Sequence, residues 1–142
     1  SLIQLLQMLE LMAQTKEYRL LHNADYAYKL KESETRRINL VINYAARHFQ
    51  KHITLDAAAA LLNMTPTSFS RYFRIKTSKS FSDFITELRI RHACKLLSED
   101  DDKTISQVSY ACGFNTLSNF NRQFKRHMKM TPKAYREQFS TL

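Results

Sequence analysis

Arg71 and Arg122 are the side chains of this 142-residue chain whose type and spacing best suit a chemistry of recognition, because they occupy equivalent positions of a segment that occurs twice. An arginine guanidinium can hydrogen-bond to O6 and N7 of guanine together, and an amide such as that of Asn121 can bind N6 and N7 of adenine. One surface arginine is more often a solvated charge. Two at matching positions of a repeat favour the recognition of DNA bases.

The repeat itself covers about residues 55–84 and 105–135. Its first half aligns at an offset of 50 residues and its second half at 51, so the second copy has one extra residue, near Asn115. Each copy predicts a short helix, a turn and a longer helix. A helix-turn-helix sets its second helix in the major groove, so two such units could place two reading helices on one duplex.

Helix-start signals locate the two reading helices. Thr65 followed by Pro66 predicts an N-cap and a first helical position, and the second helix starts at Thr116 or the residue before it. Hydroxyls and backbone N–H groups at such starts can bind phosphates. The expected helices span 66–76 and 116–128.

Within these two helices, phenylalanines mark an inward stripe and polar side chains an outward surface. Leu117 suits either side, because its spacing to Phe120 and Phe124 also fits a core position. The residues expected to bind DNA are Thr65, Thr67, Ser68, Ser70, Arg71 and Arg74 in the first unit, and Thr116, Leu117, Ser118, Asn121, Arg122 and Lys125 in the second.

Turn residues are scarce in this chain, which has one Gly and two Pro, so helices are favoured over strands. Ser80 with Asp83 predicts a capping box ahead of a long helix of about 17 residues, or about 25 Å. Gly113, where a short helix must end, suits a positive φ. We expect an all-α fold in which two helix-turn-helix lobes are joined by a long connecting helix, with an extra N-terminal helix.

The N-terminal part of the chain differs from the repeat. Its first 15 residues carry leucines at helical spacing, residues 16–34 lack sustained periodicity, and a helix resumes near Ser33. The first helix could pack on the rest of the chain or form a homodimer through residues 2–12. The expected divisions are an interdomain or dimerisation helix at 1–15, a linker at 16–34 and a DNA-binding domain at 35–142, with lobe one at 36–80, the connecting helix at 81–98 and lobe two at 103–140.

Positive charge is concentrated in the repeated part. Residues 1–35 hold four Lys and Arg against five Asp and Glu, a net charge of −1, whereas residues 36–142 hold eighteen against eight, a net charge of +10. Such a field attracts polyanions, of which double-stranded DNA is a common one, although membrane surfaces and simple solubility also account for basic charge.

Motifs of other function classes are missing from the sequence. It has no Gly-rich phosphate loop, no paired carboxylates facing one pocket and no nucleophile with a plausible base, and its five His residues lack ligand spacing. We therefore expect no catalysis, metal or cofactor, and we expect Cys94 and Cys112 to be reduced core thiols. No stretch reaches the ~20 apolar residues of a membrane span. These patterns favour a cytoplasmic, nucleoid-associated protein without a membrane partner.

Specific motifs resemble a known family. Residues 105–125 read ISQVSYACGFNTLSNFNRQFK and lead to TPKAYR at 131–136, while the first unit reads TPTSFSRYFR at 65–74, followed by SFSDF and LRIRHACKLL. Over about 100 residues the chain resembles the C-terminal DNA-binding domain of AraC/XylS-type bacterial transcription regulators, here with the preceding linker and interdomain helix.

The resemblance implies seven helices in two lobes, whose connecting helix, about 81–97, directs both reading helices toward successive major grooves. It implies a regulator, with activation favoured, that contacts RNA polymerase and whose effector, if any, is bound by a preceding N-terminal domain. The residues it implies as facing bases are Thr67, Ser70 and Arg71 in the first helix, and Leu117, Ser118, Asn121 and Arg122 in the second.

Three positions depart from the family pattern. Ser78 and Lys129 stand where a glycine commonly follows each reading helix, and Ser109 replaces an alanine. A non-glycine residue in a left-handed cap costs on the order of 1 kcal/mol, so we expect looser or different helix ends.

A protein-interaction module is the alternative function. Its candidate surfaces are the acidic loop at 99–102 and the apolar face of residues 2–12.

Overall fold

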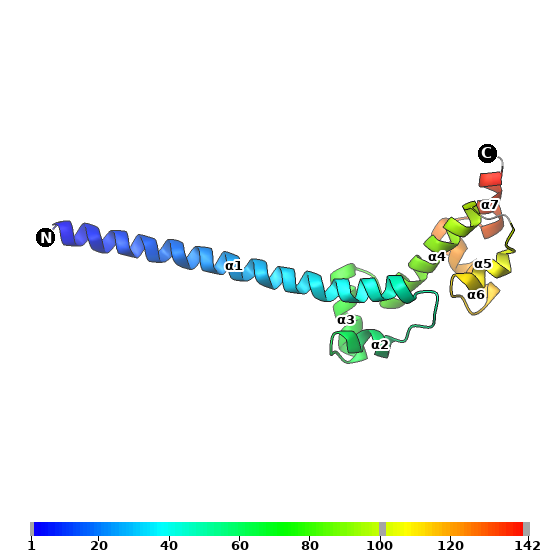
Figure 1. Cartoon of the computed structure of the whole chain (residues 1–142), viewed down its shortest axis with the longest axis horizontal. Coiled ribbons are helices and arrows are strands. Elements are labelled where there is room, and N and C mark those ends of the chain that lie inside the picture. The colour runs from blue at the N-terminus through cyan, green and yellow to red at the C-terminus, as the bar shows by residue number, and fades with distance from the viewer. Residues whose placement is uncertain (1, 100–101, 141–142) are drawn as a thin grey trace. The chain divides into compact units, whose positions relative to one another are not determined.

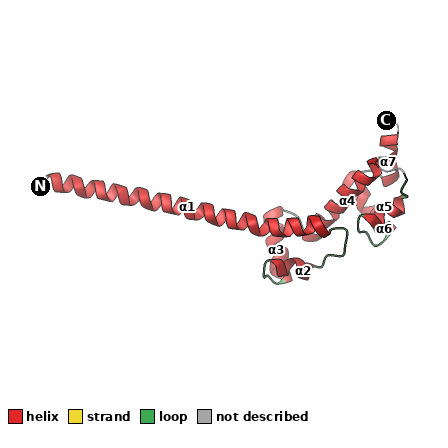
Figure 2. Cartoon of the chain, in the orientation of Figure 1, coloured by secondary structure: helices red, strands yellow, loops and turns green. Residues whose placement is uncertain are grey.

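The computed structural model describes the backbone of residues 2–99 and 102–140, and the side chains of these residues except 12–22 and 140. Every regular element in that part is an α-helix, as Figure 2 shows, which confirms the expected all-α fold. The helices, labelled in Figure 1, are α1 (Leu2–His48), α2 (Leu55–Leu61), α3 (Pro66–Thr77), α4 (Phe81–Glu99), α5 (Ile105–Ala111), α6 (Leu117–Met128) and α7 (Pro132–Ser140).

The chain divides into two units, residues 1–39 and 40–142, and α1 contributes to both. Apolar side chains near the start of α1 are between 54% and 73% exposed; they are Leu2, Ile3, Leu5, Leu6, Met8, Leu9 and Leu11. The side chains of Met12 and Ala13, which belong to the same expected stripe, lie outside the described part, as do Asp100 and Asp101 of the acidic loop.

The helix α1 is continuous, so the interruption expected over residues 16–34 is wrong. Ion pairs one helical turn apart stabilise this stretch: Asp25 pairs with Lys29 at 3.3 Å and Glu32 with Arg36 at 3.6 Å. An apolar stripe marks a helix that buries one face, whereas the side chains of residues 23–33 in this stretch are exposed. Missing periodicity here therefore accompanies exposure and does not indicate the absence of a helix.

The first lobe begins its helices as the sequence predicts. The hydroxyl of Thr54 accepts a hydrogen bond of 3.1 Å from the backbone N–H of Ala57, and that of Thr65 accepts one of 3.2 Å from Ser68. Pro66 is the first residue of α3, where its missing N–H leaves no hydrogen bond unmade. Both threonines act as N-caps, which confirms the prediction for Thr65.

The second lobe repeats the design with stronger capping. Thr104 and Gln107 form a capping box, in which each side chain accepts from the other residue's backbone N–H. Thr116 caps α6 through Asn119, and Thr131 caps α7 through Ala134, both at 3.1 Å. The turn between α5 and α6 contains residues 112–116 and that between α2 and α3 residues 62–65, so the extra residue of the second copy lies in its turn.

Left-handed residues end the helices at equivalent points of the two copies. Asn63 has φ 54° and Gly113 has φ 99°, at the repeat offset of 50, and Ser78 and Lys129 end α3 and α6 with φ 63° and 62°. The N–H of Ser78 and that of Lys129 each bond to the carbonyl four residues earlier. The expectation that these two helices end differently without glycine is therefore wrong, because the left-handed cap forms.

Each lobe has its own core, and α4 contributes to both. In the first lobe the Phe81 ring packs edge-on against Phe69 and Phe73 at centroid distances of 5.4 and 5.3 Å. The core of the second lobe is built on Phe120 and Phe124, both fully buried. The α4 residues that join this second core are Ile90, Ala93 and Leu97.

The loop after α1 contacts the turn of the second lobe. A Cβ added at Gly113 would lie 2.8 Å from the carbonyl oxygen of Phe49 and 2.9 Å from that of Gln50. From α4, Arg89 Nε donates to the same Phe49 carbonyl at 2.7 Å, and its Nη2 donates to the Lys51 carbonyl at 3.1 Å. The two lobes are therefore joined by this contact as well as by α4.

Candidate nucleic-acid interface

The exposed side of α3 carries the first set of predicted DNA-binding residues. Thr67, Ser68, Arg71 and Arg74 are exposed and Ser70 is half-buried, whereas Phe69 and Phe73 lie in the core. The side chains of Arg71 and Arg74 make no hydrogen bond or ion pair with the rest of the described chain. Their donors are therefore available to an external acceptor.

The exposed side of α6 carries the second set. Ser118, Asn121, Arg122 and Lys125 are exposed. Arg122 Nη2 donates to Asn119 Oδ1 at 2.8 Å, which fixes the plane of the guanidinium and leaves most of its five N–H donors unused. The side chains of Asn121 and Lys125 have no hydrogen-bond partner in the described chain.

Threonine caps bring two further donors to the helix starts. The hydroxyl oxygens of Thr65 and Thr116 accept backbone hydrogen bonds from Ser68 and Asn119. A hydroxyl has one O–H donor besides its lone pairs, so each capping threonine still has a proton to donate to a phosphate. Both threonines are exposed.

Leu117 is the predicted site residue whose position is mixed. Its side chain is half-buried and packs against the core of the second lobe. It also lines a hollow of about 590 Å³ beside α6, together with apolar Ile105 and Pro132 and basic side chains that include Arg122 and Lys125. Both positions that its spacing allowed are therefore partly realised: Leu117 packs on the core, and part of its side chain remains at the surface.

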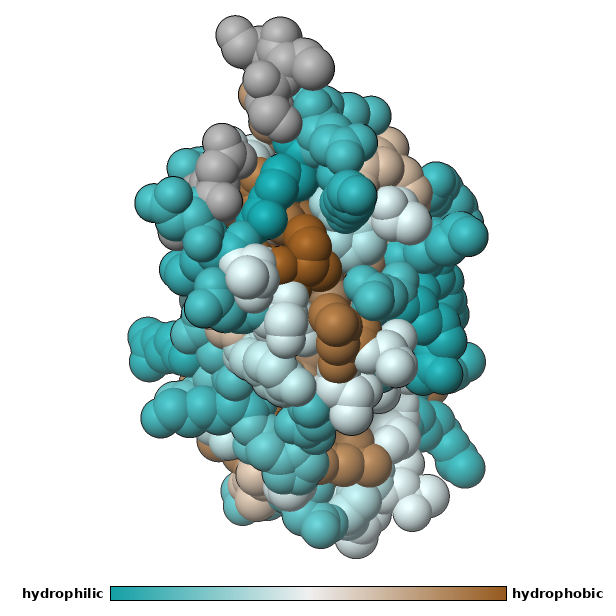
Figure 3. Space-filling view, turned by 90° about the vertical axis from the view of Figure 1, so that its right-hand side faces the viewer, coloured by the Kyte–Doolittle hydropathy of each residue, from teal (hydrophilic) through white to brown (hydrophobic). Residues whose placement is uncertain are grey.

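The electrostatics of the two helices favour a polyanion. Neither α3 nor α6 contains Asp or Glu, and each carries several basic residues along its length. Figure 3 shows the side of the molecule at the right of Figure 1, whose surface is largely hydrophilic with small apolar patches. An exposed face with positive charges and no carboxylate of its own attracts phosphates without competition from intramolecular ion pairs.

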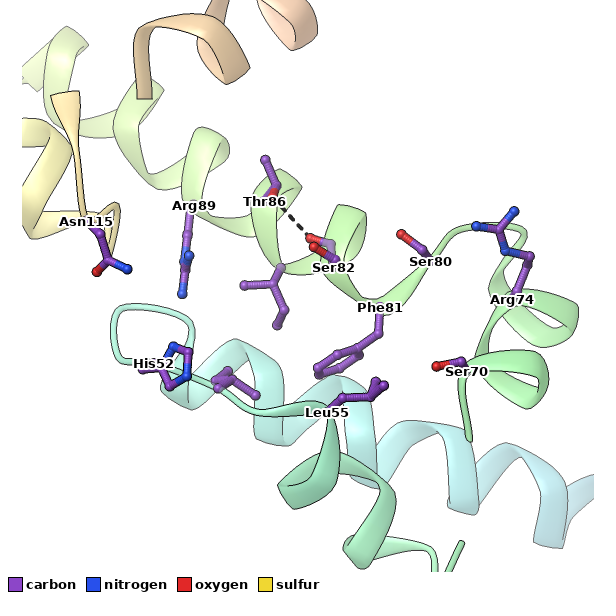
Figure 4. Close-up of a pocket in the computed structure, with 12 residues that line it drawn as sticks. His52, Leu55, Ser70, Arg74, Ser80, Phe81, Ser82, Thr86, Arg89 and Asn115 are labelled. Atoms are coloured by element: carbon purple, nitrogen blue, oxygen red, sulfur yellow. Dashed lines mark hydrogen bonds between the residues drawn. The ribbon is translucent and has the colours of Figure 1, made fainter. Parts of the chain in front are cut away.

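A cavity of about 560 Å³ is lined by residues of the first lobe and of α4, and by Asn115 from the turn of the second lobe. Ser70 and Arg74 of α3 line one end, and Asn115, which precedes the cap of α6, lines the other (Figure 4). Arg89 and His52 lie between these ends. Sequence reasoning did not assign Asn115, Arg89 or His52 to a binding surface, because their proximity depends on how the lobes pack together.

A metal site requires several ligating side chains, and a membrane span requires a long apolar helix. The described residues contain no group of three or more His, Cys, Asp or Glu that could hold a metal ion. They also include no helix that is both long and apolar enough to span a membrane. Cys112 is buried and Cys94 half-buried, both as free thiols, and burial raises the pKa of Cys112 to about 12.

A family model described as a helix-turn-helix domain matches residues 58–138, more than half of the chain, including both reading helices. An AraC-type DNA-binding-domain regulator from Chromobacterium violaceum has the same fold, with a TM-score of 0.68 at 22% identity over 76% of this chain and 96% of that one. This chain belongs to the AraC-type helix-turn-helix family. The resemblance seen in its motifs is confirmed.

Relatives of this AraC-type chain are regulators with longer sequences. The HTH-type transcriptional regulator YobQ of Bacillus subtilis is 34% identical over 95 residues, which is 67% of this chain and 39% of the relative. The chain spans about two fifths of the length of such curated relatives. The DNA-binding domain of AdpA, solved in complex with a target DNA, is 26% identical over 72% of this chain and 92% of that domain, with a TM-score of 0.67.

Proposed function

We propose that this AraC-type chain is a sequence-specific DNA-binding transcription regulator that reads two successive major grooves with α3 and α6. One observation carries the proposal: two capped helices at equivalent repeat positions each present an exposed, basic and carboxylate-free face. The complex of the similar AdpA domain with its target DNA supports duplex DNA as the partner.

The roles of the side chains follow from their donors. Arg71 and Arg122 donate to guanine, Asn121 binds adenine, and Thr67, Ser70 and Ser118 reach neighbouring base edges. Leu117 supplies an apolar contact that suits the methyl group of thymine. The residues that hold the backbone are Thr65, Ser68, Arg74, Thr116 and Lys125, whose contacts with phosphates fix the register of both helices.

Regulation requires partners besides DNA. As the family resemblance implies, the chain activates transcription by contacting RNA polymerase, and an effector, if one exists, binds to an N-terminal domain. It acts on chromosomal DNA in the cytoplasm and catalyses no reaction itself. Reporter transcription from a promoter that carries the bound site distinguishes activation, which raises transcript levels, from repression, which lowers them.

A homodimer contact through residues 2–12 is the second part of the proposal. The seven exposed apolar side chains between Leu2 and Leu11 present more apolar surface than a solvated helix needs. Sedimentation of the chain should give a dimer that L5E/L9E converts to a monomer. A wild-type chain that stays monomeric at concentrations up to about 100 μM would contradict the homodimer. The proposal that α3 and α6 bind DNA would still stand.

The deciding experiment is selection of bound duplexes from a random library at two salt concentrations. Recovery of two short sequence blocks about one helical turn apart, about 10 base pairs, supports reading by both lobes. Each phosphate contact adds about 0.9 to the slope of log K against log salt, whereas an apolar protein interface is nearly insensitive to salt. A single block would mean that one lobe only grips phosphates, and no enrichment would contradict the proposal.

A further inference from the structure

The cavity between the lobes has an unusual charge balance. Arg74 and Arg89 are both among its lining residues, which include no Asp or Glu. Arg89 is half-buried, and its hydrogen bonds go to the neutral carbonyls of Phe49 and Lys51. Burial lowers the pKa of Arg89, yet a guanidinium stays charged at neutral pH. Two positive charges therefore share one cavity without a counter-charge.

Polar groups at both ends of the cavity are also unused. Arg74 and Asn115 are exposed, and neither side chain has a partner in the described chain. Of the lining hydroxyls, Ser80 Oγ accepts from the Asp83 N–H at 3.1 Å and keeps its own proton, whereas the Thr86 hydroxyl donates to the Ser82 carbonyl at 3.0 Å (Figure 4). Free donors are therefore present at both ends of the cavity.

The position of the cavity relates it to the duplex. Ser70 and Arg74 are one helical turn apart on α3, and Asn115 directly precedes the cap of α6. If α3 and α6 occupy successive major grooves, the minor groove between them and the two backbones that border it face the space between the helices. That groove is about 6 Å wide in B-form DNA, and its bordering phosphates are the polyanion nearest to the cavity.

We infer that this interlobe cavity is a third DNA contact, in which Arg74 and Asn115 bind backbone phosphates of the spacer between the two blocks read by α3 and α6. The inference rests on the proposed function. Arg89 adds positive charge from the cavity wall without leaving its carbonyl partners. Because the backbones approach one another where the minor groove is narrow, spacers that narrow this groove bind more tightly although none of their base edges is contacted.

The test uses the full chain and the selected duplex, carrying one neutral methylphosphonate at a time along the spacer. Neutralising the phosphate that faces Arg74 is expected to weaken wild-type binding about tenfold, as the loss of a charge-assisted hydrogen bond does. In Arg74→Gln, the methylphosphonate at that position should not weaken binding any further. The slope of log K against log salt should be smaller than that of wild type by about 0.9. In Asn115→Ala, a methylphosphonate at a second spacer position should no longer weaken binding.

Lys95→Gln is the matched control, because Lys95 is an exposed cation of α4 that does not line the cavity. Lys95→Gln should lose the same affinity as wild type at each methylphosphonate position of the spacer. Arg74 has no partner to lose, so Arg74→Gln should unfold at the wild-type urea concentration.

Two results overturn the inference while leaving the proposed function intact: a wild-type affinity that no spacer methylphosphonate changes, or an Arg74→Gln variant as sensitive as wild type. Failure to select any duplex overturns both.

Discussion

Arg89 Nε donates a hydrogen bond of 2.7 Å to the backbone carbonyl of Phe49, which lies 40 residues earlier in the chain. The same guanidinium lies 5.8 Å from the ring centre of Phe114 and so contacts the turn of the second lobe. Arg89 therefore connects α4, the loop after α1 and the second helix-turn-helix. The relative positions of the two reading helices depend on this connection.

Arg89→Met tests this connection. Methionine retains much of the length of the side chain but leaves the carbonyls of Phe49 and Lys51 without their donor, which should lower the free energy of unfolding by about 2–4 kcal/mol. Urea titration measures this change. Arg91→Met is the control, since Arg91 makes an exposed ion pair with Glu87 and should cost less than about 1 kcal/mol. Equal effects of the two variants would contradict a joining role for Arg89.

Gly113→Ala probes the contact of the loop with the turn. An alanine would be strained at φ 99°, and its Cβ would lie 2.8 Å from the Phe49 carbonyl oxygen. We expect a loss of at least about 2 kcal/mol of stability, because the left-handed conformation and the backbone contact both resist a side chain. Asn63→Gly, at the equivalent turn of the first lobe, should shift stability by less than about 1 kcal/mol. A wild-type melting temperature for Gly113→Ala would show that the loop can move away.

His92 makes the same interlobe contact dependent on pH. Burial lowers its pKa, with Lys95 and Lys103 adding to the effect, and the ring packs on Phe49 at a centroid distance of 5.4 Å. Its Nε2 lies 3.1 Å from the Gln50 side-chain nitrogen, which can only donate, so the imidazole accepts as a neutral ring.

The unfolded chain takes up a proton at His92 near pH 6.5, above the folded pKa. The stability that neutral His92 contributes is therefore complete above about pH 6.5 and is lost as the pH falls toward the folded pKa. Urea titrations should show that the free energy of unfolding of wild type falls between pH 8 and pH 5. The fall should be smaller in His92→Gln. A His92→Gln variant with the full wild-type fall would contradict this role of His92.

Ser109→Ala examines the departure from the family pattern in α5. Ser109 is fully buried, and its hydroxyl has no hydrogen-bond partner in the described chain. A buried hydroxyl without a partner costs about 1–3 kcal/mol, so alanine should raise the free energy of unfolding by about 1 kcal/mol. Val108→Ala, which shortens the fully buried neighbour, should lower it. Destabilisation by Ser109→Ala would mean that the hydroxyl has a partner after all.

Local signals in the sequence predicted the helix-turn-helix units well. Thr65 and Thr116 cap their helices as expected, because capping depends on residues only three positions apart. The interruption of α1 was mispredicted, since periodicity reports a buried face and an exposed helix has none.

The interlobe cavity could not be predicted from such local signals. Asn115, Arg74 and Arg89 adjoin one cavity only because the loop after α1 packs on the turn at Gly113. Nothing in the spacing of these residues along the chain encodes that contact. The sequence therefore predicted the two reading surfaces separately and did not reveal the cavity between them.

Arg122→Ala tests base reading by the second lobe. Arg122 is exposed and bonds only to Asn119 within the described chain, so its removal should leave the urea midpoint unchanged. Loss of a bidentate contact with guanine should weaken binding to the selected duplex by about 1–3 kcal/mol and relax the preference at one base pair. Arg126→Ala, on the same helix but outside the predicted set, should weaken all duplexes slightly and equally. An unchanged sequence preference in Arg122→Ala would remove this residue from the base-reading set, because a phosphate contact changes affinity without changing which base is preferred.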